Sequence, residues 1–188
     1  MSIPTDEALI QFLDRIPGTQ DRDGYVAHIL QIGRMRPQAR HVLEIGSFLG
    51  GSAIAWAYAC PNAFVNCLDP AFAPYERGGE SICHYHAVNN TRRAGVSHRV
   101  FFYGCYSEDM PSFIPVPVDI LYIDGEHTYE AVKKDCAWLT HVDVGGFVAF
   151  DDWIEPVARA VEESFALFGK WEPVLPPSFI PRVFRRLA

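Results

Sequence analysis

Short apolar segments of strand length alternate with helix-like segments along most of the chain, and this alternation limits the possible folds more than any other feature. Five segments are strand-like, at residues 41–45, 63–68, 99–103, 118–123 and 146–150. Four are helix-like, at residues 52–58, 81–93, 129–139 and 156–168. The segment 118–123 is almost wholly apolar, which is typical of a strand covered on both faces. Right-handed crossovers between such strands predict an α/β fold with a doubly wound, mostly parallel sheet.

The two ends of the chain extend this core. Apolar residues at helical spacing predict two amphipathic helices, from about Thr5 to Ile16 and from about Asp21 to Met35. Near the other end, strands at 171–175 and 180–185 are joined by a Pro-Pro-Ser turn and could pair antiparallel. A length of 188 residues suits a single domain, 1–188, with N-terminal helices in 1–40 and the α/β core in 41–188.

Composition argues against several classes of partner. The formal net charge is −7, from 16 basic and 23 acidic residues, whereas a nucleic-acid binder usually carries a basic excess on one face. The five cysteines are odd in number and scattered, which favours reduced thiols over a disulfide framework. No segment resembles a signal peptide or an apolar span of about 20 residues. We therefore expect a cytoplasmic protein that binds neither nucleic acid nor a membrane.

A glycine turn follows the first strand. Gly46 comes directly after residues 41–45, and the spacing up to Gly50 and Gly51 is Gly-x-x-x-Gly-Gly. This spacing differs from the Gly-x-Gly-x-x-Gly of nicotinamide dehydrogenases and counts against that class. Glu44 stands two residues ahead of the first glycine, and a carboxylate there suits a cationic or amine-bearing ligand better than a pyrophosphate. The alternative is an ordinary strand-to-helix turn with a chance acid.

Two further candidates follow the second and third strands. Asp69 ends the second strand, where an acid can accept hydrogen bonds from both hydroxyls of a ribose. The alternative is a plain turn, because Asp-Pro favours turns and Pro70 comes next. Cys105 follows the third strand and could line the same pocket, although a packing role is equally consistent with its position.

Acidic residues also follow the fourth and fifth strands. Asp124 and His127 come after residues 118–123, and Asp151 and Asp152 come after residues 146–150. If the first, fourth and fifth strands are neighbours, the three carboxylates converge beside Gly46, where they repel one another unless a cation or protons intervene. Hard oxygen ligands suit Mg²⁺, Mn²⁺ or Ca²⁺. The alternative is that these residues form a turn and cap a helix.

Two stretches resemble a known family. VLEIGSFLGGSA resembles the first motif of class I S-adenosylmethionine-dependent methyltransferases. VDILYIDGEHTYEAVKKDCAWLTHVDVGGFVAFDDW is similar to the metal-dependent O-methyltransferases that tailor macrolides, aminocoumarins and related antibiotics or sugars. The resemblance spans about residues 43–165, and Asp151 and Asp152 lie 27 and 28 residues after Asp124. It implies a Rossmann-like methyltransferase fold with S-adenosylmethionine and Mg²⁺ as cofactors and a hydroxylated small molecule as substrate.

The resemblance also implies a role for each candidate residue. Its cofactor site would comprise Glu44, Gly46, Ser47, Phe48, Gly50, Ser52, Asp69, Cys105 and Asp124. Mg²⁺ would bind Asp124, Asp151 and Asp152, and His127 or Asp124 would receive the substrate's proton. Relatives often have Gly-Asp-Ser after the third strand, whereas this chain has Cys105 and Tyr106 there, so adenine would be held differently, for example on an aromatic ring.

Other outcomes remain open at this point. The same fold could support a metal-independent methyltransferase, or a protein that binds S-adenosylmethionine without catalysis. Few residues precede the first strand, so the lid over the site is small, and a homodimer would help to cover it. Candidate elements for acceptor specificity are 71–80, His84–His86, Trp153 and 176–181.

Overall fold

The computed structural model describes residues 5–17, 24–74, 79–109 and 114–188. The helices are α1 (Asp6–Leu13), α2 (Tyr25–Arg34), α3 (Gly51–Ala59), α4 (Ile82–Ala94), α5 (Tyr129–Asp135) and α6 (Glu155–Phe165). The strands are β1 (His41–Ile45), β2 (Phe64–Leu68), β3 (Val100–Tyr103), β4 (Val118–Ile123), β5 (Val142–Phe150), β6 (Trp171–Pro173) and β7 (Arg182–Arg186). Short 3-10 helices lie at Pro70–Phe72, Ser107–Asp109 and Cys136–His141.

Within the described residues, the strands form one seven-stranded sheet in the order β3-β2-β1-β4-β5-β7-β6. The strands from β3 to β5 are parallel, while β7 pairs antiparallel with both β5 and β6. The prediction of a mostly parallel sheet with an antiparallel C-terminal pair is therefore confirmed. The first strand, β1, lies in the middle of the sheet. The next two strands extend outward to β3, and the chain then crosses back to place β4 on the other side of β1. The order of strands thus reverses between β1 and β4, where ligands bind in folds of this kind.

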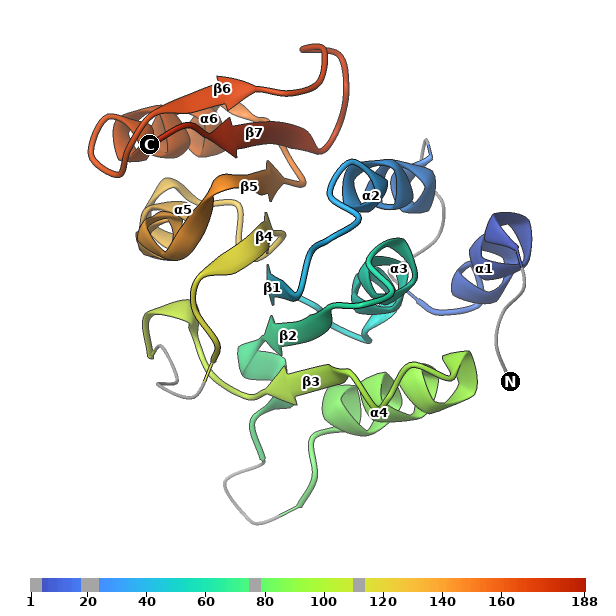
Figure 1. Ribbon diagram of the computed structural model, residues 1–188. Coiled ribbons are helices and arrows are strands. Elements are labelled where there is room, and N and C mark those ends of the chain that lie inside the picture. The colour runs from blue at the N-terminus through green and yellow to red at the C-terminus, as the bar shows by residue number, and fades with distance from the viewer. Residues whose placement is uncertain (1–4, 18–23, 75–78, 110–113) are drawn as a thin grey trace.

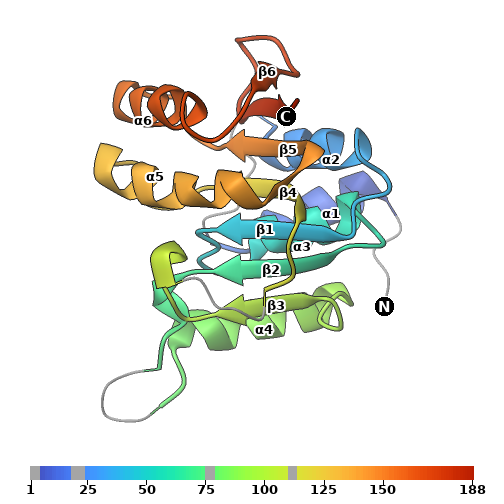
Figure 2. The same cartoon turned by 60° about the vertical axis from the view of Figure 1, so that its left-hand side comes forward.

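Helices cover both faces of the sheet, giving three layers. Figure 1 shows α2, α3 and α4 on one face, with α1 outside them, and α5 and α6 on the other. Figure 2 shows that the arrowheads of the parallel strands point toward the same end of the molecule. Successive residues of β1 face the two sides of the sheet in turn: Val42 belongs to the core cluster that includes residues of α2 and α3, and Leu43 to the cluster that includes residues of α5 and α6.

Most element boundaries agree with the prediction to within a few residues. The start of the second predicted helix, at Asp21, lies outside the described residues. The predicted helix 129–139 is α-helical only to Asp135 and continues as a 3-10 helix. Its last carbonyls are bound from another element, because the guanidinium of Arg186 donates to Thr140 and Leu139. β5 begins four residues before the predicted strand, with an irregular register against β4 and a positive φ of 80° at Gly145.

In the ranges that the structure describes, none of the helices is both long enough and apolar enough to cross a membrane.

Candidate active site

A cavity of about 590 Å³ opens at the carboxyl ends of the parallel strands. Four loops contribute to its walls, those that follow β1, β2, β3 and β4, together with one side of α5 and the start of α2. Its lining includes Tyr25, Gly46, Ser47, Phe48, Ser52, Asp69, Cys105, Tyr106, Ser107, Asp124, Gly125 and Asp135. Most of the candidate cofactor residues therefore surround one space. The candidates outside this lining are Glu44, Gly50, His127, Asp151 and Asp152.

The glycine turn fits closely against the end of β4. Gly46 has a φ of 83°, and a methyl group on its Cα would lie 2.1 Å from the backbone oxygen of Asp124. No side chain fits there, so glycine is required both by conformation and by space. Phe48 has a positive φ of 46°, which is unusual for a residue other than glycine. Backbone strain of this kind concentrates at ligand sites, and Phe48 lines the cavity.

Asp69 holds the glycine turn from the end of β2. Its Oδ2 accepts hydrogen bonds from the amides of Ser47 at 3.0 Å and Phe48 at 2.8 Å. Its Oδ1 accepts from the amide of Ala71 at 2.8 Å. A carboxylate has about four acceptor sites, so these three bonds leave capacity for one more donor from the cavity. The carboxylate thus shapes the turn and still faces the space beside it.

Glu44 is fully buried beneath the turn. Neither of its carboxylate oxygens has a hydrogen-bond partner in the described part of the chain. Burial raises the pKa of Glu44 to about 7, although nearby Ser47, Ser52 and Cys67 act to lower it. A buried acid without a partner is costly to the fold. Such a group is suited to pair with a positively charged ligand that enters above it.

The carboxylates after β4 and β5 are connected through two tyrosines. The Tyr25 hydroxyl donates to Asp124 at 3.2 Å, and the Tyr122 hydroxyl donates to Asp151 at 2.7 Å. The two hydroxyls lie 3.0 Å apart. Burial, and then the charge of Asp124, raise the pKa of Asp151. The condition set by the sequence, that β1, β4 and β5 are neighbours, is met, because β4 pairs with both β1 and β5.

His127 lies between the carboxylates that follow the two strands. Its Nδ1 is 2.9 Å from Asp152, and its Nε2 is 3.6 Å from Asp124. Interaction with Asp124 raises the pKa of His127 against the effect of burial, and the charges of Asp152 and Asp151 add to the rise. The Nε2 atom is buried and has no hydrogen bond from the residues that the structure describes. With Nδ1 bound to a carboxylate, Nε2 is the nitrogen that remains for chemistry.

The donor set is compatible with a hard divalent cation. Asp124 and Asp151 follow adjacent strands, and burial and then the charge of Asp124 raise the pKa of Asp151, an effect that a bound cation would relieve. Oxygen donors of this type are the ones that Mg²⁺ prefers. As the side chains stand, however, no group of three or more His, Cys, Asp or Glu among the described residues is arranged to hold a metal. The chemistry of the donors fits the ion, and His127 is placed where positive charge is favoured.

The far wall of the cavity is made by α5 and the loop after β3. The Ser107 hydroxyl donates to Asp135, and the Trp138 indole donates to the Ser107 carbonyl at 3.0 Å. Burial raises the pKa of Asp135 to about 6, against the effect of Ser107. Cys105 and Tyr106 line the same wall. Thus the loop that carries Cys105 and Tyr106 faces a buried acid on α5.

Sequence reasoning missed Tyr25, Tyr122 and Asp135. Nothing in the sequence distinguishes Tyr25 from an ordinary helical tyrosine. Tyr122 could have been found, because it lies two residues before Asp124 and therefore on the same side of β4. Asp135 also has a signal, since it occupies an inward position of the helix beside buried Cys136. In both cases a polar group on an apolar face was the available clue.

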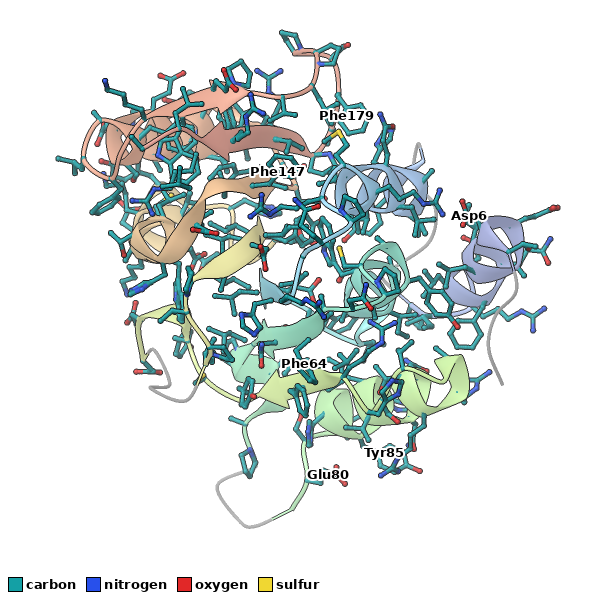
Figure 3. All side chains as sticks on the ribbon, in the orientation of Figure 1. Asp6, Phe64, Glu80, Tyr85, Phe147 and Phe179 are labelled. Atoms are coloured by element: carbon teal, nitrogen blue, oxygen red, sulfur yellow. The ribbon has the colours of Figure 1, made fainter. Side chains whose placement is uncertain are left out.

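The predicted specificity elements are only partly described. Residues 75–78 of the segment 71–80 lie outside the described residues. Phe179, between β6 and β7, contacts the ring of His28 on α2 with centroids 4.1 Å apart, and Figure 3 shows it over that helix. Trp153 packs on Phe184 and under the guanidinium of Arg182. The C-terminal hairpin therefore reaches across to α2, close to Tyr25.

One curated protein matches part of the sequence, and solved structures of known proteins share the fold. An uncharacterized protein of Acanthamoeba polyphaga mimivirus is 37% identical over 68 residues, which cover 32% of this chain and 31% of that protein. The chain thus spans about a third of the length of that curated relative. The O-methyltransferase TomG of Streptomyces achromogenes, involved in tomaymycin synthesis and solved with SAM, has a TM-score of 0.64 at 18% identity, over 99% of this chain and 92% of that one. An O-methyltransferase of Bacillus cereus in complex with SAH has a TM-score of 0.67 at 17% identity, over 99% and 93%.

The assignment to a family comes from the sequence around the cavity. A family model described as a methyltransferase domain matches residues 43–153, more than half of the chain. The matched region begins in β1, before the glycine turn, and ends at Trp153, just after Asp151 and Asp152. It therefore contains both the cavity loops and the carboxylates beside them. This chain belongs to the methyltransferase domain family.

Proposed function

We propose that the chain is an S-adenosylmethionine-dependent O-methyltransferase that acts on a hydroxylated small molecule with the assistance of Mg²⁺. The observation that carries the proposal is the position of the cavity. It joins the glycine turn and Asp69 at one side to Asp124 at the other, and Asp124 in turn belongs to the cluster with Asp151 and His127. The O-methyltransferases of similar fold, solved with SAM or SAH, support the same ligand.

The cofactor's polar groups match the donors and acceptors of this space. One ribose hydroxyl would reach Asp69, whose carboxylate faces the cavity with capacity for one more donor. The amino group of the methionine part is positively charged and would lie above Glu44, which is buried and has no partner. The sulfonium methyl would then face Asp124 and the cluster beyond it. Positioning of this kind contributes much of the rate in a transfer between two bound molecules.

Proton removal from the acceptor falls to His127. Asp152 holds Nδ1 and so fixes the ring orientation, which leaves Nε2 to take the hydroxyl proton. The raised pKa makes the imidazole a stronger base than a free histidine. Asp124, 3.6 Å from Nε2, stabilises the imidazolium that forms. The tyrosine hydroxyls keep Asp124 and Asp151 oriented toward the same point.

Mg²⁺ would be held by Asp124, Asp151 and Asp152. When bound, such an ion lowers the pKa of a coordinated hydroxyl and orients it. The residues of the chain supply the oxygen donors, and their mutual repulsion is the reason to expect an ion there. We also retain the homodimer predicted from the sequence as a proposal, since a second copy would help to cover the cavity.

The experiment is a calorimetric titration with S-adenosylmethionine, with Mg²⁺ and with EDTA, followed by a screen of hydroxylated acceptors for methyl transfer. Asp151→Asn tests the metal site, and Asp6→Asn, at the outer surface on α1 (Figure 3), is the matched control. We expect cofactor binding in all three proteins and a Mg²⁺ heat that only Asp151→Asn loses. Absence of cofactor binding to the wild type would refute the proposal.

A metal-independent methyltransferase is the second candidate. The observation in its favour is the Nδ1 contact of His127 with Asp152, because it engages a carboxylate that the metal reading needs. In that case His127, oriented by Asp152, acts as the general base without an ion. Methyl transfer that persists in EDTA would support this reading. Binding without transfer to any acceptor would instead favour a non-catalytic binding protein.

A further inference from the structure

Asp135 is a buried acid that the mechanism above does not use. It closes α5, and its residue is only 6% exposed, yet it lines the cavity. One carboxylate oxygen, Oδ1, accepts from the Ser107 hydroxyl. The other oxygen lies beside Gly125, where an added methyl group would be 3.4 Å away. No hydrogen bond reaches this second oxygen within the described part of the chain, so it is available to a ligand.

The surroundings hold Asp135 in a fixed position. Besides the Ser107 bond, the Trp138 indole donates to the Ser107 carbonyl, and Lys134 pairs with Glu108 at 2.8 Å. Three contacts therefore tie the 3-10 helix after β3 to the end of α5. A carboxylate held in this way loses little further freedom when it binds a ligand. The wall is built to present one oxygen to the cavity.

The order of the strands indicates which part of the cofactor meets this wall. The carboxylate cluster follows β4 and β5, and Asp69 follows β2. Ser107 follows β3, at the outer end of the row. If the sulfonium faces Asp124 and the ribose faces Asp69, the base occupies the remaining space, between the loop after β3 and α5. Neighbouring strands are about 4.8 Å apart, so the row from β3 to β4 spans about 14 Å, which suits an extended nucleoside with a methionine attached.

We propose that Asp135, oriented by Ser107, accepts a hydrogen bond from the exocyclic amino group of the cofactor's adenine and so selects adenine over a 6-oxo purine. The inference rests on the proposed function. An ionised carboxylate only accepts hydrogen bonds. The amino group of adenine donates two, whereas the carbonyl oxygen of hypoxanthine at the same place would be repelled. With a pKa of about 6, Asp135 is mostly ionised near pH 7.5 and has the required form.

The loop after β3 carries the neutral side chain of Cys105 and the acid Glu108 in the lining of the cavity. The Glu108 carboxylate is paired with Lys134 at 2.8 Å. Asp135 comes from α5 and reaches the wall from the opposite side. A purely structural role for Asp135, as a tie between α5 and Ser107, predicts no preference between purines. The two readings therefore differ in a measurable ratio.

The test compares binding of S-adenosylhomocysteine with that of S-inosylhomocysteine, its hypoxanthine analogue, by calorimetry. The proteins are wild type, Asp135→Asn, Ser107→Ala and the surface control Asp6→Asn. We expect the wild type and the control to prefer the adenine ligand by at least about tenfold, because a charge-assisted hydrogen bond is exchanged for a repulsion. In Asp135→Asn the ratio should fall toward one, since an amide can donate as well as accept. Ser107→Ala should lower the ratio severalfold by releasing the carboxylate, and it serves as the second variant if Asp135→Asn does not fold.

Each result separates the inference from the proposed function. If the wild type binds both ligands equally well, or if folded Asp135→Asn and Ser107→Ala keep the wild-type ratio, the role of Asp135 is refuted while the cofactor assignment stands. If the wild type binds neither ligand, the proposed function itself fails and the inference fails with it. A loss of affinity for both ligands at an unchanged ratio indicates a structural role and also overturns the proposal.

Discussion

Glu44→Gln should stabilise the ligand-free protein at alkaline pH. Glu44 is fully buried without a hydrogen-bond partner, and burial raises its pKa from 4.5 to about 7. The folded state therefore binds the Glu44 proton more tightly than the unfolded state. Between about pH 4.5 and pH 7 the native protein holds more protons, so the free energy of unfolding falls as the pH rises through this window. Above it both states are ionised and the loss is complete.

The magnitude follows from the two pKa values. For a group with these values, linkage predicts that the free energy of unfolding falls by about 2.5 kcal/mol between pH 5 and pH 8. Glutamine cannot ionise, so this loss should be absent in Glu44→Gln. For a domain of this size, 1 kcal/mol corresponds to a shift of roughly 2–4 °C in Tm. The variant should thus gain about 5–10 °C in Tm relative to wild type on going from pH 5 to pH 8.

Thermal unfolding of both proteins at pH 5 and pH 8, followed by circular dichroism, measures this difference of differences. Other groups that titrate in the same range cancel, because they are common to the two proteins. Asp6→Asn, an exposed acid paired with Arg34, should follow the wild type at both pH values. If the Tm difference between Glu44→Gln and wild type is the same at pH 5 and pH 8, ionisation of the buried Glu44 carboxylate does not destabilise the fold as predicted.

Three other changes follow from the structure. His127→Asn should lower the rate of methyl transfer by about 10²–10⁴-fold and leave the affinity for S-adenosylhomocysteine nearly unchanged. An equal loss of rate and affinity would indicate that the substitution distorts the cavity and that His127 is not the base. Gly46→Ala should cost more than about 3 kcal/mol in urea unfolding, because its methyl group meets backbone 2.1 Å away. Gly145→Ala, with a similar φ of 80° but only an ordinary van der Waals contact at 3.6 Å with the Arg36 guanidinium, should cost only about 1–2 kcal/mol, and equal costs would exclude the clash. Asp119→Asn should lower the free energy of unfolding by about 1–3 kcal/mol, since its partner Arg36 is only 13% exposed. Asp6→Asn removes an exposed ion pair and should change the free energy of unfolding by no more than about 0.5 kcal/mol. Equal values would show that burial does not determine the cost of losing the pair.

Much of the fold could be predicted because the strands carry a strong local signal. The bounds predicted for β1 and β4 are those observed, since both strands are apolar on two faces and are closed by a glycine turn or an acid. The early start of β5 was missed because Val142–Gly145 pairs irregularly around a glycine with positive φ. The change from α5 to a 3-10 helix after Asp135 was missed, and the carbonyls of Leu139 and Thr140 in that 3-10 helix are bound by Arg186, 47 residues away from Leu139. Long-range bonds of this kind leave no trace in local periodicity.

The candidate site was likewise predictable only where its residues follow from local sequence signals. Asp69 and Asp124 could be found because the ends of parallel strands meet at one edge, so position in the sequence predicts position in space. The tyrosine bridge between Asp124 and Asp151 could not, because Tyr25 comes from a helix 99 residues before its partner. Partners brought by tertiary packing depend on how α2 crosses the sheet, and composition does not encode that crossing.

The acids around the cavity give one further consequence for turnover. The pKa values of Glu44, Asp135 and Asp151 are all raised by burial, so negative charge on them is costly in the ligand-free protein. Asp135 lines the cavity, whereas Glu44 lies beneath its glycine turn and Asp151 is linked through Tyr122 and Tyr25 to Asp124 at its edge. Under the proposed function, S-adenosylmethionine would bring a sulfonium charge into that space, and transfer of the methyl group would remove it. The electrostatic attraction is therefore strongest before the reaction and weaker after it. An acidic site of this kind favours the methyl donor over its demethylated product, and so the fold's cost in stability contributes to product release.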